Sequence, residues 1–373
     1  MDKLGFGMMR LPMPDPNQQE KIDFEQVCSM VDAFLEKGFT YFDTAYMYHK
    51  GQSEITLREA LVKRHPRSSF TVADKMPLYH LKDGTEEDQD RIFHEQLEKC
   101  GVEYFDYYLL HNMNQESYQT AQRLDTFSYL LKKKEEGYIK HLGFSFHDKE
   151  GLLEEILTAH PEVEFVQLQL NYLDWEDERV QSRKCYEVAV KHGKYVIVME
   201  PVKGGKLASV PEDVNAMFRA AHPDWSPASW AVRFAASLPN VKMVLSGMSD
   251  MDQILDNTRS MQEMSPLTDA ELQILTRAAD IIAAMPAIAC TGCRYCVDGC
   301  PQSIAIPDYF DLYNLAQTML RGGNEPPKAI YAKLAASGGK PTDCVQCRQC
   351  ESACPQHLPI VNWLERIAKT FEG

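Results

Sequence analysis

Eight of the eleven cysteines fall in two copies of one spacing pattern near the carboxyl end of the chain. Each copy reads C-x2-C-x2-C-x3-C-P: the first comprises Cys290, Cys293, Cys296 and Cys300, and the second Cys344, Cys347, Cys350 and Cys354. Three thiolates at two-residue gaps let one tight loop bind three corners of an iron–sulfur cubane. The pattern therefore predicts two [4Fe–4S] clusters.

The fourth cysteine of each copy lies farther along the chain, directly before a proline. In two-cluster ferredoxins this fourth cysteine binds the other cluster. We therefore assign Cys354 to the first three cysteines of the first copy, and Cys300 to the first three of the second. The alternative is a pair of structural zinc sites, which typically use two C-x2-C knuckles a dozen or more residues apart. The three scattered cysteines, Cys28, Cys100 and Cys185, are expected to be buried apolar fillers.

A second group of reactive side chains ends three consecutive strand-like runs. Asp43, Lys75 and His111 occupy these ends, and Tyr48 follows Asp43 by five residues. Taken singly, such a residue is more often a solvated loop charge, a helix cap or a structural histidine. Because they close consecutive strands, they form a candidate active site if the strands are parallel neighbours.

The elements that position these residues are eight strand-like runs that alternate with amphipathic helical stretches. This alternation over about 250 residues is typical of a (β/α)8 barrel, whose active-site groups sit at the C-terminal ends of the strands. One predicted helix covers 24–37, and another covers 53–64 with Ser53 as its N-cap. The predicted strands are Leu4–Gly7, Phe39–Ala45, Phe70–Lys75, Phe105–His111, His141–Phe146, Phe165–Asn171, Tyr195–Pro201 and Lys242–Gly247.

The chain is expected to divide into a barrel of residues 1–280 and an iron–sulfur domain of residues 281–373. Between the two cysteine patterns, residues 307–336 show a helix-like apolar stripe that is broken at 322–323 and resumes at 326–327. Bacterial-type ferredoxins have β-hairpins and a short spacer there, so this insert resembles the α-helical ferredoxins instead. The predicted fold class is α/β, a TIM barrel followed by a mostly α-helical ferredoxin-like domain.

Composition excludes several other functions. Asp plus Glu number 54 against 39 Lys plus Arg, which gives a net charge of −15 and a surface that repels nucleic-acid phosphates and anionic lipid. No apolar run approaches the roughly 20 residues of a membrane span. The first ten residues do not read as a signal peptide, so we expect a cytoplasmic protein whose thiols stay reduced.

Several short motifs lie along the barrel region: Gly5–Pro12, Phe42–Tyr48, Ala73–Lys75, Tyr107–His111, Gly143–Ser145, and Asn257 after Ser246–Gly247. In these motifs the barrel region resembles the aldo-keto reductase superfamily. The resemblance covers nearly all of residues 3–280, and with the tail the chain resembles the branch that is fused to a ferredoxin-type domain.

The resemblance implies a catalytic role for each of four residues. Tyr48 would donate a proton to the carbonyl oxygen while a nicotinamide delivers hydride to the carbonyl carbon. An unperturbed phenol is a poor acid at neutral pH, and a nearby ammonium lowers its pKa, which is the role of Lys75. Asp43 would pair with Lys75, and His111 would hydrogen-bond the carbonyl oxygen and orient the substrate.

The same resemblance implies NAD(P)H as cofactor and names its contacts. The segment between Ser246 and Asp256 has no Lys or Arg and three Asp, which favours NADH over NADPH, although Lys242 and Arg259 flank it. The expected contacts are Ser145 and Gln167 on the nicotinamide amide, Pro201 and Gly204 on the pyrophosphate, and Gly247, Ser249, Gln253 and Asn257 on the adenosine half.

Three functional hypotheses remain open. The first is an NAD(P)H-dependent reductase of an aldehyde or ketone, whose tail transfers electrons or docks a redox partner such as a ferredoxin, flavodoxin or flavoprotein. The second is an electron-transfer module, and the third is a redox sensor whose barrel binds nicotinamide without carbonyl turnover. Hydride carries two electrons and each cluster takes one, so direct exchange between them would need a flavin or a similar splitter. We rank the reductase first because a sensor would not need the full set of proton-transfer residues.

Overall fold

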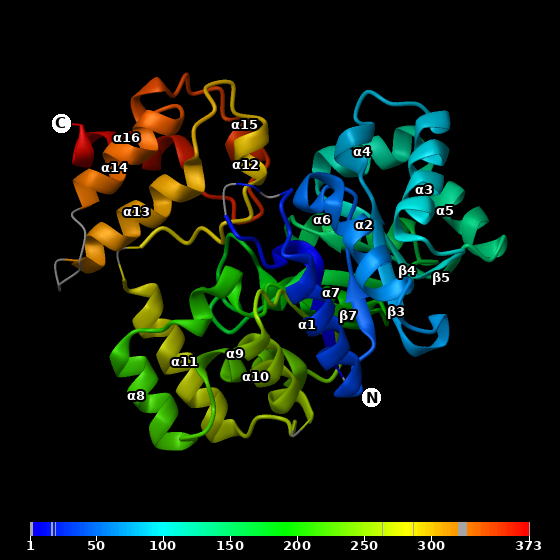
Figure 1. The fold of residues 1–373 in the computed structure, drawn as a ribbon, viewed down its shortest axis with the longest axis horizontal. Helices are drawn as coiled ribbons and strands as arrows, with labels where there is room; N and C mark the ends of the chain where they lie inside the picture. Colours follow the sequence, from blue (N-terminus) through cyan, green and yellow to red (C-terminus); the bar gives the residue numbers. More distant parts are fainter. Residues whose placement is uncertain are drawn as a thin grey trace. The chain divides into compact units, whose positions relative to one another are not determined.

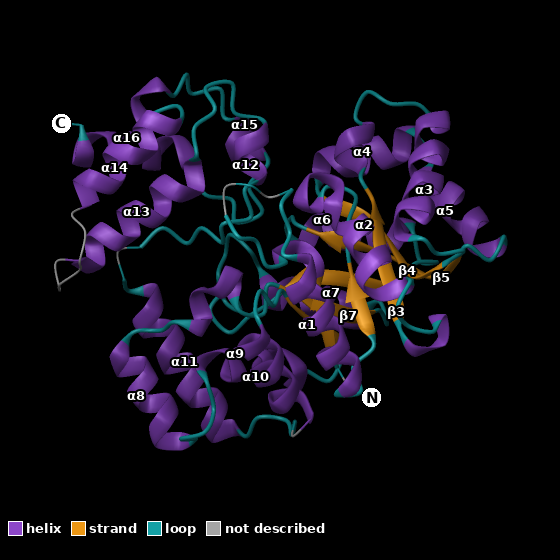
Figure 2. Ribbon diagram, in the orientation of Figure 1, coloured by secondary structure: helices purple, strands orange, loops and turns teal. Residues whose placement is uncertain are grey.

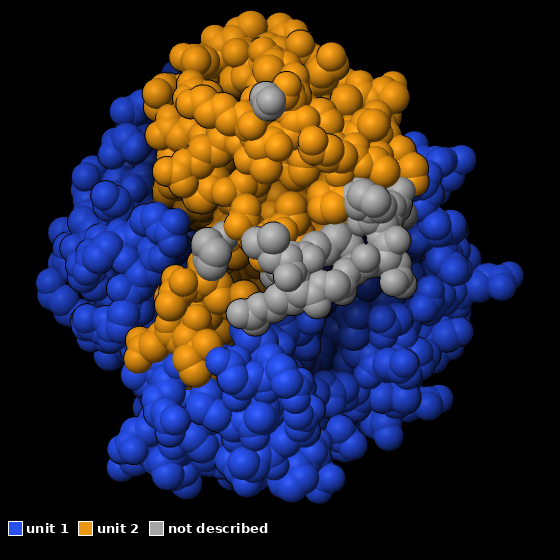
Figure 3. All heavy atoms as spheres, turned by 90° about the vertical axis from the view of Figure 1, so that its left-hand side faces the viewer, with its two compact units in different colours: residues 1–202, 207–277 blue, residues 203–206, 278–373 orange. Residues whose placement is uncertain are grey.

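The computed structural model describes residues 3–15, 18, 20–262, 264–285, 287–319 and 327–372. It consists of two compact units (Figure 3): residues 1–202 with 207–277, and residues 203–206 with 278–373. The short segment 203–206 therefore belongs to the second unit, which the sequence did not lead us to expect. The predicted domain boundary between residues 280 and 281 remains a prediction.

Eight parallel strands of the first unit close into a barrel in chain order, with β8 paired to β1 (Figure 2). The predicted barrel is confirmed, and the predicted strand ends differ from the observed ones by no more than two residues. The strands are β1 (Leu4–Gly7), β2 (Tyr41–Asp43), β3 (Thr71–Met76), β4 (Phe105–Met113), β5 (Ile139–Phe146), β6 (Phe165–Gln169), β7 (Tyr195–Met199) and β8 (Val241–Ser246).

Helices surround this barrel (Figure 1). The helices up to residue 283 are α1 (Phe24–Glu36), α2 (Gln52–Leu57), α3 (Glu86–Cys100), α4 (Gln115–Arg123), α5 (Thr126–Glu135), α6 (Glu150–Ala159), α7 (Ser182–Lys191), α8 (Glu212–Ala221), α9 (Pro227–Ser237), α10 (Met251–Gln262) and α11 (Asp269–Ala283). Helix α8 packs on α9 instead of on a strand, and α11 runs past residue 277, where the first unit ends. In α1, Val27, Met30, Val31 and Phe34 are buried at the spacing of one helix face, and Asp23 caps the first turn.

The prediction that Ser53 caps a helix is wrong. Helix α2 begins one residue earlier, after Gly51, whose φ of 84° marks a left-handed turn. The Ser53 hydroxyl is buried instead, 2.8 Å from the Thr44 hydroxyl and 3.2 Å from the Met8 carbonyl oxygen. Ser53 thus ties the segment after β2 to the end of β1.

Large side chains fill the interior of the barrel, as in other closed eight-stranded sheets. Tyr41, Leu109, Phe165 and Leu245 pack together there from four different strands. Gly5 on β1 makes room for two of them, because a Cβ at this position would lie 2.6 Å from the Leu245 side chain. This packed layer closes the barrel beneath the strand ends that carry the candidate catalytic residues.

The second unit is mostly helical, as predicted. Its helices are α12 (Tyr295–Asp298), α13 (Ile306–Met319), α14 (Pro327–Ser337), α15 (Gln349–Ser352) and α16 (Ile360–Phe371). Helices α13 and α14 form the expected insert between the cysteine patterns, and the expected break at 322–323 lies outside the described residues. Ile306, Tyr309, Tyr331, Leu364 and Ile367 contribute to its core. Among the described helices of either unit, none combines the length and apolarity needed to cross a membrane.

Candidate functional site

A buried ion pair lies at the centre of the candidate active site. Lys75 near the end of β3 is fully buried, and its ammonium lies 2.5 Å from Asp43 Oδ1 at the end of β2. The same ammonium donates to the Thr44 carbonyl oxygen at 2.6 Å, and the Gln167 amide donates to Asp43 Oδ2 at 3.2 Å. Burial raises the pKa of Asp43, and the Lys75 charge opposes that rise. The structure therefore holds one ammonium in a fixed position inside the barrel.

Tyr48 and His111 lie beside this ammonium. The Lys75 nitrogen is 5.0 Å from the centre of the Tyr48 ring, and the His111 ring meets the Tyr48 ring edge-on at 6.0 Å. Burial, with a smaller contribution from the Lys75 charge, lowers the pKa of His111 well below its ordinary value. The imidazole is therefore neutral at physiological pH and can donate a hydrogen bond without carrying charge. The structure thus brings together all four predicted catalytic residues.

Backbone strain flanks two of these residues. His49, directly after Tyr48, has a φ of 52°, and Asn112, directly after His111, has a φ of 58°. Left-handed conformations are unfavourable for residues other than glycine and often mark functional sites. The Asn112 backbone N–H donates to the Ser145 hydroxyl at 2.8 Å, which links the end of β4 to β5. The predicted contact residue Ser145 is therefore held in place and keeps its own hydroxyl proton to donate.

The residues predicted to contact the adenosine half lie after β8 and on α10. The Asn257 amide donates to Ser246 Oγ at 3.0 Å, while its own buried Oδ1 accepts no hydrogen bond. The Ser249 backbone N–H donates to Gln253 Oε1 at 2.9 Å, and Gly247 stays exposed. A buried acceptor without a donor is costly unless a ligand supplies one, so Asn257 fits a nucleotide site.

Arg10 is a charged neighbour of this region that the sequence reasoning did not single out. A Cβ at Gly247 would lie 3.1 Å from the Arg10 side chain, and the Ser249 hydroxyl donates to the Arg10 carbonyl oxygen at 2.7 Å. The Arg10 guanidinium also lies 3.6 Å from a Glu200 carboxylate oxygen. The sequence did carry a signal for Arg10, because this residue follows shortly after the first predicted strand. In a closed barrel the end of β1 must meet the end of β8, where the adenosine contacts are predicted.

The two predicted pyrophosphate contacts differ in their surroundings. Pro201 is buried in the first unit, whereas Gly204 belongs to the second unit. A Cβ at Gly204, whose φ is 63°, would lie 2.3 Å from the Thr291 carbonyl oxygen, beside the first cysteine of the cluster patterns. Gly204 is therefore required for this close packing, and its role towards a nucleotide remains a prediction.

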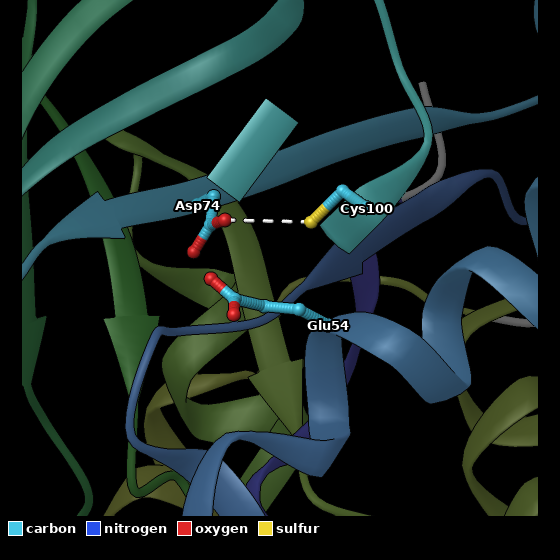
Figure 4. Close-up of side chains that lie close together, drawn as sticks. All are labelled: Glu54, Asp74 and Cys100. Atoms are coloured by element: carbon cyan, nitrogen blue, oxygen red, sulfur yellow. Dashed lines mark hydrogen bonds between the residues drawn. The ribbon is translucent and has the colours of Figure 1, made fainter. Parts of the chain in front are cut away.

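A buried acidic cluster lies close to Lys75, and the sequence reasoning missed it. Figure 4 shows Glu54, Asp74 and Cys100 pointing toward one another, with the Cys100 thiol donating to Asp74 at 3.5 Å. Burial, together with the Glu54 charge, raises the pKa of Asp74 well above its ordinary value, and burial also raises the pKa values of Glu54 and Cys100. Cys100 and Cys185 are buried, as expected, and the Cys100 thiol also has a polar partner in Asp74, whereas Cys28 is only partly buried. Gln96 connects this cluster to β3, since its side-chain amide donates to both Glu54 and the Lys75 carbonyl oxygen.

The eight patterned cysteines line two separate hollows in the second unit. Each hollow takes three cysteines from one pattern and the fourth from the other pattern. One is lined by Cys290, Cys293, Cys296 and Cys354, and the other by Cys300, Cys344, Cys347 and Cys350. Four sulfur ligands converging on one space are the donor set of a [4Fe–4S] cluster, so these residues fit the predicted groups.

Burial raises the pKa values of thiols that line both hollows. It raises the pKa of Cys290 to about 11, and it raises the pKa of Cys350 to about 11 as well. Iron binds the thiolate form, so a cluster would have to displace protons from these thiols on binding.

Comparison with known families matches both parts of the chain. The Aldo/keto reductase family matches residues 3–280, and the 4Fe-4S dicluster domain matches residues 289–360. The chain is 28% identical over 235 residues to a soybean (Glycine max) protein named probable aldo-keto reductase 1, which covers 60% of this chain and 63% of that relative. It is 29% identical over 229 residues to an aldo-keto reductase of Mycolicibacterium vanbaalenii, which covers 60% of this chain and 74% of the relative. The chain thus spans less than two thirds of the soybean protein.

Solved structures share the barrel. The holo form of the aldo-keto reductase AKR11C1 from Bacillus halodurans aligns with a TM-score of 0.58 and 23% identity, covering 74% of this chain and 91% of that one. An aldo-keto reductase from Klebsiella pneumoniae in complex with NADPH aligns with a TM-score of 0.55 and 19% identity, covering 74% and 90%. At these identities the likeness establishes the fold. The family match over most of the chain shows that this protein belongs to the aldo/keto reductase family, and it carries a 4Fe-4S dicluster domain at its carboxyl end.

Proposed function

We propose that the barrel reduces an aldehyde or ketone with NAD(P)H, and that the tail binds two [4Fe–4S] clusters that carry electrons for, or dock, a redox partner protein. The observation that carries this proposal is the convergence of Asp43, Tyr48, Lys75 and His111 at one end of the barrel. In this proposal residues 1–280 form the reductase domain and residues 281–373 the ferredoxin-type domain.

Each of the four residues has a defined task in this reaction. A bound reduced nicotinamide would supply the hydride, which is two electrons and one proton, to the carbonyl carbon. The neutral imidazole of His111 donates a hydrogen bond to the carbonyl oxygen. Tyr48 gives that oxygen its proton, and the Lys75 ammonium stabilises the phenolate that remains. The ion pair with Asp43 keeps the ammonium in position beside the Tyr48 ring. With the hydride on carbon and the Tyr48 proton on oxygen, the product is an alcohol.

The nucleotide contacts follow from the same arrangement. Ser145 and Gln167, at neighbouring positions of β5 and β6, are proposed to hold the nicotinamide amide. Asn257 offers its unpartnered Oδ1 to the adenosine half. Arg10 beside Gly247 is a candidate partner for a phosphate, which would let the site accept NADPH although the segment 246–256 lacks Lys and Arg.

Carbonyl-dependent oxidation of NADH and NADPH tests the proposal. A panel of small aldehydes and ketones is offered to wild type and to the Tyr48→Phe variant, with nucleotide binding measured by fluorescence. We expect wild-type turnover with at least one carbonyl and a loss of about 10² to 10⁴ in Tyr48→Phe, because that is the usual contribution of a positioned proton donor. Unchanged nucleotide affinity in the variant is the control, and equal rates in the two proteins would refute the proposal.

A second candidate function is an electron-transfer module, which the two cysteine-lined hollows favour. The full chain with reconstituted clusters is treated with dithionite, and its visible absorbance is recorded. Bleaching of the thiolate-to-iron charge-transfer band supports redox-active clusters. An unchanged band would leave the tail a purely structural or docking role.

A further inference from the structure

Gln96 on α3 is a fully buried amide whose polar atoms all have partners. Its nitrogen donates to the Lys75 carbonyl oxygen at 3.0 Å and to Glu54 Oε1 at 3.1 Å. Its oxygen accepts from the Tyr108 hydroxyl at 2.5 Å. An amide side chain has two N–H donors, so both are used here, and the carbonyl oxygen also has a donor. Three elements, β3, α2 and β4, therefore fix the orientation of this one side chain.

The backbone of Lys75 is held on both sides of its Cα. Gln96 donates to the Lys75 carbonyl oxygen, and Asp74 Oδ1 accepts from the Lys75 backbone N–H at 2.8 Å. Side chains of consecutive strand residues point to opposite faces of a sheet, so the Lys75 side chain extends away from that of Asp74. On its own face the ammonium contacts Asp43 and the Thr44 carbonyl oxygen. Lys75 is thus fixed both at its backbone and at its ammonium.

The same amide also contacts the helix that follows the candidate proton donor. Glu54 lies on α2, six residues after Tyr48, and residues 49–51 between them all have a positive φ. The Lys75 ammonium lies 5.0 Å from the centre of the Tyr48 ring. Gln96 therefore connects the backbone of Lys75 to the segment that carries Tyr48 through two hydrogen bonds of one side chain. So short a connection limits how far Lys75 and Tyr48 can move apart.

Resting on the proposed function, we propose that Gln96 is a positioning residue for carbonyl reduction. By holding the Lys75 carbonyl group and Glu54 together, it keeps the ammonium at its distance from the Tyr48 ring. An ammonium in this place favours the phenolate that remains after proton transfer, so its displacement makes Tyr48 a weaker proton donor. A misplacement of about 1 Å can lower a rate by about 10²-fold. Gln96 acts on the reaction only through Lys75.

Several titratable groups surround Gln96. They are Glu54 on α2, Asp74 on β3, Glu95, Lys99 and Cys100 on α3, and Tyr108 on β4. Gln96→Met keeps an unbranched side chain of similar length, removes the hydrogen bonds and replaces none of these groups. A change that this variant causes at Tyr48 therefore acts through the position of Lys75 or through the charge of Glu54, and the variants below separate the two.

Alkaline titration of the full chain, followed by the near-ultraviolet absorbance of phenolate, tests the proposal. The curve of Tyr48 is obtained by subtracting that of Tyr48→Phe from that of wild type, and likewise in the Gln96→Met background. We expect the Tyr48 midpoint to lie about one pH unit higher in Gln96→Met, because a unit charge at about 4 to 6 Å shifts a titration by about 1 to 3 units. An unchanged or lower midpoint would overturn the proposal.

Gln89 offers a matched control on the same helix. It is fully buried about two turns earlier on the same face of α3, and it accepts from the Thr126 hydroxyl of α5 at 2.6 Å. Gln89→Met should lose stability, as Gln96→Met does, because each loses a buried hydrogen bond, but its Tyr48 midpoint should stay at the wild-type value. Equal shifts in the two variants would indicate general loosening and contradict the positioning role.

Two more variants address the cause. Glu54→Gln keeps an acceptor for Gln96 and removes the carboxyl group, so we expect no shift; a shift as large as that of Gln96→Met would assign the effect to the Glu54 charge and overturn the proposal. Tyr108→Phe is the milder second variant, because it leaves Gln96 in place and removes only the hydrogen bond to its oxygen. It should raise the Tyr48 midpoint by a smaller amount. If neither Tyr108→Phe nor Gln96→Met raises it, the proposal is wrong.

Carbonyl-dependent oxidation of NADH and NADPH separates this inference from the proposed function. If wild type reduces no carbonyl of the panel, the proposed function fails, whereas the phenolate titration still measures the effect of Gln96 on Tyr48. If wild type is active, we expect the rate of Gln96→Met at pH 7 to fall about tenfold or more below that of Gln89→Met. Equal rates in these two variants, with wild type active, would refute only the inference.

Discussion

The buried ion pair makes a sharp prediction for the Lys75→Met variant. Two unit charges 2.5 Å apart attract each other by about 6 to 7 kcal/mol at an effective dielectric constant of about 20. The cost of removing both charges from water offsets much of this attraction in wild type. With the ammonium gone, the Asp43 carboxylate stays buried with the Gln167 amide as its remaining side-chain donor. We therefore expect Lys75→Met to lower the free energy of unfolding by about 3 to 5 kcal/mol.

The same variant should acquire a pH dependence of known sign. Burial already raises the pKa of Asp43, and loss of the ammonium removes the charge that opposes this rise. An acid whose folded pKa exceeds its unfolded pKa makes the folded state lose stability as pH rises between the two values. The penalty in Lys75→Met should therefore grow from pH 5 to pH 8, by about 1.4 kcal/mol for each pKa unit of added shift. The double variant Asp43→Asn with Lys75→Met removes both charges and should recover most of the loss.

Urea unfolding followed by tryptophan fluorescence measures these differences, because Trp175, Trp225 and Trp230 all lie in the barrel unit. Wild type, both single variants and the double variant are compared at pH 5 and pH 8. The electrostatic reasoning would be refuted if Lys75→Met lost less than about 1 kcal/mol at pH 8. It would equally fail if the double variant were no more stable than Lys75→Met.

Three further outcomes are expected. The folded pKa of Asp74 is raised well above its ordinary value, so the free energy of unfolding of wild type should fall as pH rises through that pKa. Urea unfolding at pH 6 and pH 9 measures this fall. The fall should be smaller in Asp74→Asn, which lacks the carboxylate. Gly204→Ala should lower the melting temperature of the second unit, whereas Gly205→Ala, with a similar left-handed backbone but open space around it, is the control; equal losses would contradict the packing. Cys354→Ala should perturb the electron paramagnetic resonance signal of the cluster bound by Cys290, Cys293 and Cys296. A change confined to the other cluster would contradict the assignment of Cys354 to the first cysteine pattern.

Much of the barrel could be predicted because its signals are local. Each strand is a short apolar run, and the candidate catalytic residues stand at the ends of such runs. The ends of β2, β3 and β4 therefore identified Asp43, Lys75 and His111 as candidates without knowledge of contacts. The cysteine spacing is equally local. Prediction of Ser53 as a cap failed because its hydroxyl is satisfied by distant partners on other segments.

Features that depend on long-range packing could not be predicted. Asp74 and Lys75 are neighbours on β3, so their side chains point to opposite faces of the sheet, and the partners of Asp74 come from α2 and α3. No pattern in the sequence indicates that Glu54 and Cys100 meet it there. Segment 203–206 likewise follows β7 in the chain, yet its contacts are with residues 288, 291 and 356.

Transfer of deuterium from C4 of labelled NADH or NADPH to the carbonyl carbon tests the central claim most directly. Wild type and Tyr48→Phe are given the same aldehyde under single-turnover conditions, and the alcohol is analysed by mass spectrometry. The account predicts deuterium in the wild-type product and a transfer rate about 10² to 10⁴ lower in Tyr48→Phe, with nucleotide binding retained. An alcohol without deuterium, or equal transfer rates in the two proteins, would contradict it.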